Sequence, residues 1–148
     1  MNTTEKADSA VRMLLDGFNC AQSVLVCCSE DRGLPREFAL RVAQAFGGGI
    51  GRTGNLCGAL TGALMTVGMR CAALEASDSP SKNRAHELAR QVLSEFAARN
   101  KSLLCRDLTG CDLTTEEGHR RFKDEEIAQR VCAQLVRSAV EITEKVLS

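Results

Sequence analysis

Apolar residues recur at intervals of three and four along most of this 148-residue chain, and that spacing constrains the fold more than any other feature. Residues spaced in this way lie on one side of an α-helix, whereas a half-buried strand needs strict alternation. No alternating pattern of any length is present. We therefore predict a single all-α domain over residues 1–148, a bundle of about six to seven helices.

Capping residues, glycines and prolines divide the pattern into segments. Asn19 is expected to cap the second helix, and Pro35 to occupy the first turn of the third. A short helix is predicted over 102–108, ended by Gly110, with a capped turn at 114–117. The predicted apolar stripes are Val11, Leu14, Leu15 and Phe18; Ala21, Val24, Leu25 and Cys28; Phe38, Val42, Ala45 and Phe46; Ala85, Leu88, Val92, Leu93 and Phe96; and Ala128, Val131, Leu135, Ala139, Ile142 and Val146, the last in a helix from about Asp124.

One segment, residues 56–73, is apolar nearly all round and is predicted to be the central and most buried helix. Thr61, Thr66 and Arg70 interrupt the apolar run that extends to Leu74, so it is typical of a core helix and not of a membrane span. Because about six short helices leave part of such a segment uncovered, we also expect a homodimer.

The charge balance excludes two kinds of partner. Lys plus Arg number 19 and Asp plus Glu number 19. The chain therefore lacks the basic excess that binding to nucleic acid or to a membrane surface requires. The first eight residues are polar and contain no apolar segment of a secretory signal. We expect a cytoplasmic protein without membrane insertion, in which thiols stay reduced.

Eight cysteines are unusual in a cytoplasmic chain of this length. They indicate metal binding or catalysis, although free cysteine also serves as a small buried hydrophobic residue. No two cysteines have the CxxC spacing, so neither a thioredoxin-type site nor a zinc ribbon is indicated. His86 and His119 lie in polar stretches and are interpreted as solvated surface residues. The roles of Cys27, Cys28, Cys71 and Cys111 stay open.

Two cysteines stand where a helix is predicted to begin. Cys20 follows Asn19, and Cys57 follows Asn55 and Leu56. The first turn of a helix offers unpaired N–H groups and the positive end of the macrodipole. Both features stabilise a thiolate, which is the nucleophile and the metal ligand. We therefore predict lowered pKa values for Cys20 and Cys57 and select them as redox candidates.

A glycine-rich loop, GGGIGRTG at residues 47–54, precedes Cys57. It contains the GxGxxG spacing, but no strand precedes it, so a dinucleotide site is not indicated. Its glycines favour the approach of backbone N–H groups to a sulfur or an anion. Gly58 and Gly62 lie four residues apart in the next helix, where they indicate a close crossing with another helix.

Cys20, the glycine loop, the segment Cys57-Gly58-Ala59-x-x-Gly62, Cys105 and Cys132 together resemble the C_GCAxxG_C_C family of redox-active bacterial proteins. The resemblance extends from the first helix to the last. It implies that these four cysteines, drawn from different helices, share one site. It also implies that Gly58, Ala59 and Gly62 are motif positions beside a bound cofactor.

Two chemistries stay open for that site. The thiols of Cys20 and Cys57 could exchange with a disulfide, or all four cysteines could ligate an iron–sulfur cluster or another thiophilic metal. Either chemistry needs an electron donor or acceptor as partner. The alternative is a non-catalytic metal-binding or interaction module with largely structural cysteines, and no pattern in the sequence identifies a substrate or an enzymatic reaction.

Overall fold

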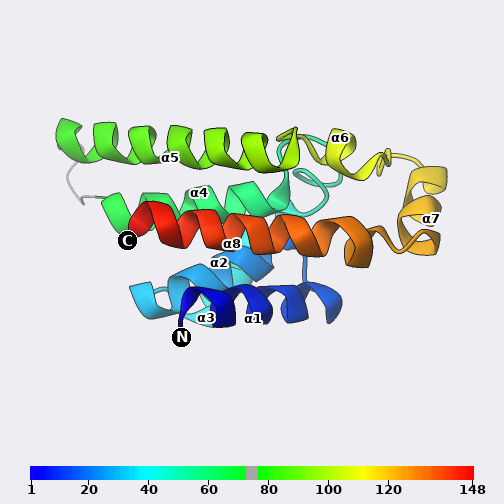
Figure 1. Cartoon of the computed structure of the whole chain (residues 1–148), viewed down its shortest axis with the longest axis horizontal. Helices are drawn as coiled ribbons and strands as arrows, with labels where there is room; N and C mark the ends of the chain where they lie inside the picture. Colours follow the sequence, from blue (N-terminus) through cyan, green and yellow to red (C-terminus); the bar gives the residue numbers. More distant parts are fainter. Residues whose placement is uncertain (73–76) are drawn as a thin grey trace.

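The computed structural model describes residues 1–72 and 77–148, and all regular structure in these ranges is helical (Figure 1). The all-α class is confirmed, with slightly more helices than predicted. Two 3-10 turns and one π-helical turn supplement the α-helices: Glu30–Arg32, Gln44–Phe46 and Ala128–Cys132. The α-helices are α1 (Thr3–Leu15), α2 (Cys20–Ser29), α3 (Arg36–Ala43), α4 (Gly58–Cys71), α5 (Ser79–Asn100), α6 (Cys105–Thr109), α7 (Glu116–Asp124) and α8 (Ala133–Leu147).

The long helices are stacked side by side along the molecule. Helix α4 packs against α2, α5 and α8, while α1 packs against α2 and α8. Figure 1 shows α5 along one edge, α1 and α3 at the opposite edge, and both termini toward the end away from α7. The short helices α6 and α7 lie at the opposite end from the termini, where the chain is least regular. This end of the bundle positions the candidate site.

Helix α2 is the most buried helix, and not α4 as predicted. Nine of its ten residues are buried, against eight of fourteen in α4. Helix α4 also begins two residues later than predicted, because Leu56 forms an isolated antiparallel bridge with Leu104. Its predicted end at Ala73 and the following Leu74 lie outside the described residues. The helices of the same chain cover much of α4, and homodimerisation stays a prediction.

Two of the three glycines of α4, Gly58 and Gly62, permit a close crossing with α2, as predicted. A β-carbon on Gly62 would lie 2.7 Å from the carbonyl oxygen of Ala21 and 3.0 Å from the β-carbon of Val24. A β-carbon on Gly58 would lie 3.1 Å from the backbone nitrogen of Ala21. Both separations are too short for ordinary packing, so a larger residue at Gly62 would push the helices apart.

Helix α3 presents the opposite face to the one predicted. Its inward residues are Ala39 and Ala43, whereas Phe38 and Val42 are 55% and 52% exposed. Small and large apolar residues both follow the helical period in this segment. Only alanines fit against α2, because Gln22 of α2 donates a hydrogen bond to the carbonyl oxygen of Leu40 at 2.9 Å and holds the helices close.

The predicted helix from Asp124 is broken near its start. Helix α7 ends at Asp124, and Glu126 has a positive φ of 53°. A left-handed residue cannot continue a right-handed helix. The chain therefore re-enters helical structure only at Ala128, in the π-helical turn that leads into α8.

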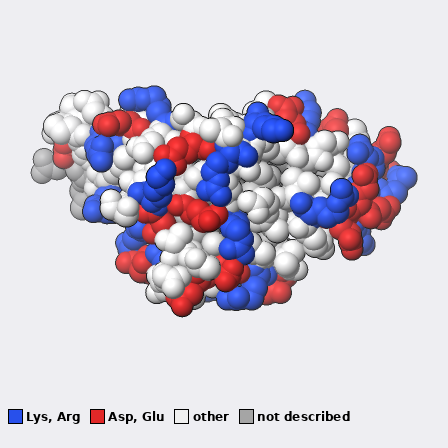
Figure 2. Space-filling model, viewed as in Figure 1, with Lys and Arg blue, Asp and Glu red and all other residues white. Residues whose placement is uncertain are grey.

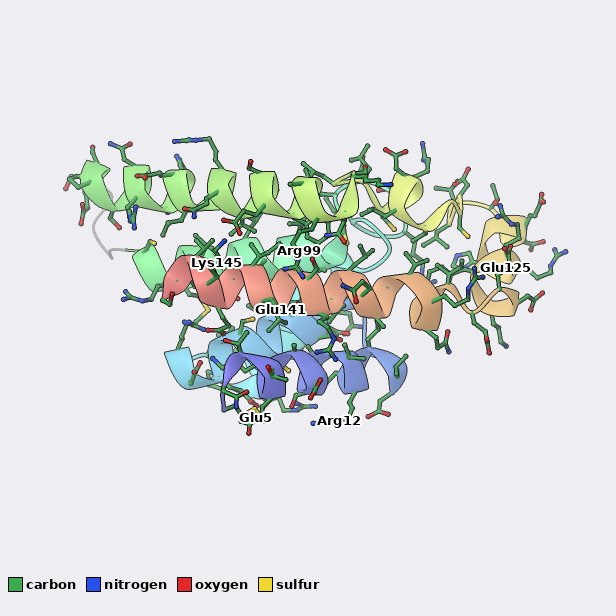
Figure 3. The ribbon with its side chains drawn as sticks, in the orientation of Figure 1. Glu5, Arg12, Arg99, Glu125, Glu141 and Lys145 are labelled. Atoms are coloured by element: carbon green, nitrogen blue, oxygen red, sulfur yellow. The ribbon has the colours of Figure 1, made fainter. Side chains whose placement is uncertain are left out.

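Ion pairs fasten the helices along the surface and at the rim of the core. Lys6 of α1, only 6% exposed, contacts Asp31 at 2.7 Å and Glu144 of α8 at 2.9 Å. In Figure 3, Arg99 of α5 lies close to Glu141 of α8, at 3.0 Å. Figure 2 shows acidic and basic residues interspersed over this face. Within residues 1–72 and 77–148, no helix has both the length and the apolarity to cross a membrane.

Candidate four-cysteine site

A cavity of about 320 Å³ is lined by all four cysteines that the sequence selected. Cys20, Cys57, Cys105 and Cys132 reach it from four separate segments, although 37, 48 and 27 residues separate them along the chain. Three of the four are less than a tenth exposed, and Cys20 is half-buried. The fold therefore brings the four thiols around one enclosed space.

Cys20 is the first residue of α2, and the predicted cap holds it there. Asn19 accepts a hydrogen bond from the backbone N–H of Gln22 at 2.8 Å, and the Gln22 side chain accepts one from Asn19 in return. The Asn19 amide also donates to the carbonyl oxygen of Gln44 at 2.9 Å. This reciprocal cap fixes the start of α2 against the segment that follows α3.

Cys57 and Cys105 are held together by one short antiparallel pairing of backbone. The N–H of Cys57 donates to the carbonyl oxygen of Leu103 at 2.8 Å, and the N–H of Cys105 donates to that of Asn55 at 2.7 Å. The bridge between Leu56 and Leu104 lies between these bonds. Cys57 and Cys105, which are 48 residues apart in sequence, therefore lie on adjacent backbone segments at the starts of α4 and α6 respectively.

Cys132 is the last residue of the π-helical turn. The N–H of Ala133 donates to the carbonyl oxygen of Ala128, five residues earlier, which widens the helix at this point. Such single turns are frequent at functional sites, because they rotate a side chain relative to the helix that follows. The wide turn thus sets the direction of Cys132 independently of the apolar face of α8.

The glycine loop forms a left-handed turn beside these cysteines. Five consecutive residues, 48–52, have φ between 60° and 68°. Two of them, Ile50 and Arg52, are not glycine, and this conformation costs roughly 1–2 kcal/mol for each such residue. Gly49 has no room for a side chain, because a β-carbon there would lie 2.6 Å from that of Cys105.

Gly48 and Gly49 of this turn line the cavity. Their backbone N–H groups donate to no acceptor within the part of the chain that the structure describes. Buried N–H groups without an acceptor are rare in proteins. The loop therefore offers donors to an acceptor in the cavity, in line with the expectation that its glycines bring N–H groups near a sulfur or an anion.

Burial makes these thiols weak acids, which contradicts the lowered pKa predicted for Cys57. It raises the pKa of Cys57 to about 12, against the backbone N–H groups of Ala59 and Leu60, which act to lower it. Burial likewise raises the pKa of Cys105 to about 11, with Cys132 nearby adding to the effect. The helix starts are present as predicted, but desolvation outweighs them.

Cys20 and Cys132 influence each other's ionisation strongly. The pKa of Cys20 is raised by the side chain of Cys132 and because it is enclosed by protein atoms. The pKa of Cys132 is lowered by the side chain of Cys20. The low-pKa thiol is therefore Cys132, and the lowered value predicted for Cys20 is wrong.

The remaining wall of the cavity is mostly apolar, and its rim carries two polar residues that the sequence did not single out. Arg52 and His119 are both exposed at this rim, and no Asp or Glu is among the described residues that line the space. His119 is exposed, as the sequence analysis expected. It lies beside the cysteines because α7, which carries it, forms part of the cavity wall. The apolar wall includes Leu14, Phe18, Leu113, Phe122 and Leu135.

The other motif positions divide into two groups. Gly58 lines the cavity, whereas Ala59 and Gly62 are not among its lining residues. Within residues 1–72 and 77–148, no three His, Cys, Asp or Glu side chains are grouped closely enough to hold a single metal ion. The cysteines outside the cavity are Cys27, Cys28, Cys71 and Cys111.

The fold and the site together define an all-α protein with a buried cluster of four thiols. A family profile described as "Putative redox-active protein (C_GCAxxG_C_C)" matches residues 18–146, and the chain belongs to this family. The match includes all four cavity cysteines. No curated protein and no solved structure matches the chain.

Proposed function

We propose that this is a redox protein whose Cys20, Cys57, Cys105 and Cys132 ligate an iron–sulfur cluster in the cavity. The convergence of the four thiols on one space of about 320 Å³ carries this proposal. Each of the six pairs among them interacts electrostatically in its ionisation. Four cysteine thiolates are the usual ligands of such clusters.

A bound metal centre would change the ionisation of these thiols. Burial and the neighbouring thiols raise the pKa values of Cys20, Cys57 and Cys105, so these three resist ionisation, and the described lining offers only Arg52 as a charged group. A metal centre reverses this effect, because coordination deprotonates a thiol outright. The resulting negative charge on sulfur would accept hydrogen bonds from the N–H groups of Gly48 and Gly49, which donate to no acceptor among the described residues.

A cluster fits the arrangement better than one ion does. A single ion bonded to sulfur at roughly 2.3 Å needs its ligands grouped tightly about a point, and the described residues contain no such group of three. A cluster spreads its ligands around a larger body, for which the cavity provides space. When bound, it would supply one-electron transfer. The apolar wall would exclude water, and the four cysteines would set its orientation.

Anaerobic reconstitution of the reduced chain with ferrous iron and sulfide tests this proposal. We expect bound iron and acid-labile sulfide together with a visible absorption band that bleaches on reduction. Cys57→Ser should remove most of both. Cys71→Ser is the matched control and should retain them, because Cys71 lies outside the cavity. Reduced chain that takes up neither iron nor sulfide would contradict the proposal.

Thiol–disulfide exchange is the second candidate, and the strong mutual influence of Cys20 and Cys132 on each other's ionisation in one cavity favours it. Oxidation would form a bond between these sulfurs and pass two electrons and two protons to a disulfide oxidant, which becomes two thiols. This candidate joins Cys20 to Cys132, whose side chain influences the ionisation of Cys20 most, whereas the sequence suggested Cys20 and Cys57. Mass spectrometry after incubation in a thiol–disulfide buffer would identify the linkage. Both chemistries start from reduced thiols, so we propose a cytoplasmic protein.

A further inference from the structure

We infer that the mouth of the four-cysteine cavity binds small molecules that combine a negative charge with an apolar body, and that Arg52 selects for the charge. This goes beyond cluster binding, because it names a class of ligand for the space outside the thiols. It applies to the reduced, metal-free chain, so it can fail without the cluster proposal failing, and the reverse.

The charged side chain among the described residues that line the cavity is positive. Arg52 is the single Lys or Arg among the described lining residues, and no Asp or Glu is among them. Its guanidinium forms no ion pair within residues 1–72 and 77–148. The first turns of α2 and α4 also reach the cavity, through Cys20 and Gly58. The surroundings therefore favour an anion.

Arg52 is held at the mouth by the left-handed turn. Its φ is 64°, and its N–H donates to the carbonyl oxygen of Gly47 at 3.0 Å. Its stem lies over Gly48, where a β-carbon would meet the Arg52 Cγ at 2.7 Å. A non-glycine residue in this conformation is strained, and such strain persists where the surrounding structure fixes it and clusters at functional sites.

The apolar side chains at the opening define the rest of the ligand. Phe18 and Phe122 line the cavity and are half-buried, so each keeps part of its surface available. Buried Leu14 and Leu113 continue the apolar wall inward. Arg52 and both rings line the same cavity as the cysteines. A carboxylate on an aromatic or aliphatic body satisfies both surfaces.

Two small aromatic disulfides test the charge selection directly. Dithiobis-nitrobenzoate carries a carboxylate on each ring, whereas dithiodipyridine is neutral. In both, the protein thiolate attacks the S–S bond, forms a mixed disulfide and expels one aromatic thiolate. The rate is followed at Cys20, the least buried of the four cavity cysteines, by peptide mass spectrometry on the reduced, metal-free chain. The variants are Arg52→Gln and, as a control with the same charge change, Arg90→Gln on the exposed surface of α5.

We expect Arg52→Gln to slow the reaction of the anionic reagent about fivefold at low salt and to leave the neutral reagent within about twofold. Added salt should shrink the difference. The neutral reagent also reports any general change in the reactivity or folding of the variant. Equal slowing of both reagents, equal effects of Arg52→Gln and Arg90→Gln, or no reaction of Cys20 with either reagent would overturn the inference.

Discussion

The cysteines inside the cavity and those outside it occupy opposite ends of their helices. Three of the cavity cysteines stand at a helix start: Cys20 in α2, Cys57 at the cap of α4 and Cys105 in α6. Three of the others stand at a helix end: Cys27 and Cys28 in the last turn of α2, and Cys71 as the last residue of α4. The position on the helix therefore separates three of the four site cysteines from three of the other four, and Cys132 and Cys111 are the exceptions.

This difference follows from the direction of the helices. Helices α2 and α4 both start at the cavity, so their unpaired N–H groups gather there. A thiolate at the other end would face carbonyl oxygens and the negative end of the macrodipole. Burial and nearby Glu144 raise the pKa of Cys28 far above its ordinary value. Cys28 accordingly packs as a neutral apolar residue in the core.

The largest expected effect is on metal content. Cys105→Ser should lose most of the iron and sulfide bound after reconstitution, because it removes a ligand from the centre of the proposed site. Cys28→Ser should retain both, although Cys28 is the more deeply buried of the two. Iron and sulfide analysis, with circular dichroism to establish folding, measures the difference. Equal loss in both variants would remove the distinction between the two sets of cysteines.

The next effect concerns the helix crossing that brings Cys20 and Cys57 together. Gly62→Ala should lower the free energy of unfolding by about 1–3 kcal/mol, because its β-carbon would meet the Ala21 carbonyl oxygen at 2.7 Å. Gly68→Ala in the same helix has no heavy atom within 4 Å of the new β-carbon. It should stabilise the protein by about 0.5–1 kcal/mol. Urea denaturation measures both, and equal effects would contradict the close crossing.

Stability should also depend on pH. Burial raises the pKa of Cys57 from 9.0 to about 12. Above pH 9 the unfolded chain loses this proton while the folded chain keeps it, so unfolding becomes more favourable. Stability is thus fully present below about pH 9 and is lost toward pH 12, by at most about 1.4 kcal/mol per pH unit.

Cys57→Ser should reduce that decline in the metal-free protein, because serine does not titrate in this range. Denaturation of wild type and variant at a series of alkaline pH values measures it. The test distinguishes burial from the effect of the helix start. If the helix start dominated, the pKa of Cys57 would be lowered, and stability would rise with pH instead of falling. An unchanged decline in the variant would show that Cys57 is not the responsible group.

Local sequence signals predicted the cap of α2 and its close crossing with α4. Asn19 caps α2, and Gly58 and Gly62 allow the close crossing. These features depend on a few neighbouring residues or on one helical period. The resemblance also selected the four cysteines that line the cavity. Where two apolar faces were available, as in α3, the period could not choose between Phe38 and Ala39.

The geometry of the site itself depends on contacts between distant segments. The bridge between Leu56 and Leu104 joins residues 48 apart, and no local pattern specifies such a pairing. The left-handed turn at 48–52 includes Ile50 and Arg52, which disfavour that conformation on their own. The lowered pKa predicted for Cys57 failed for a related reason, because burial is set by the whole fold and not by the helix start.

The smallest expected effect lies on the surface between α5 and α8, away from the first turns of α2 and α4. Arg99 and Glu141 are 3.0 Å apart and about two-fifths exposed (Figure 3). A double-mutant cycle with Arg99→Ala and Glu141→Ala should give a coupling energy of about 0.2–1 kcal/mol, because water and salt screen exposed charges.

Iron content should be unchanged in all three variants. Helix α8 directly follows Cys132. A loss of iron in these variants would therefore mean that Cys132 is positioned by the packing of α8 on α5, and not by the π-helical turn and its contacts at the cavity.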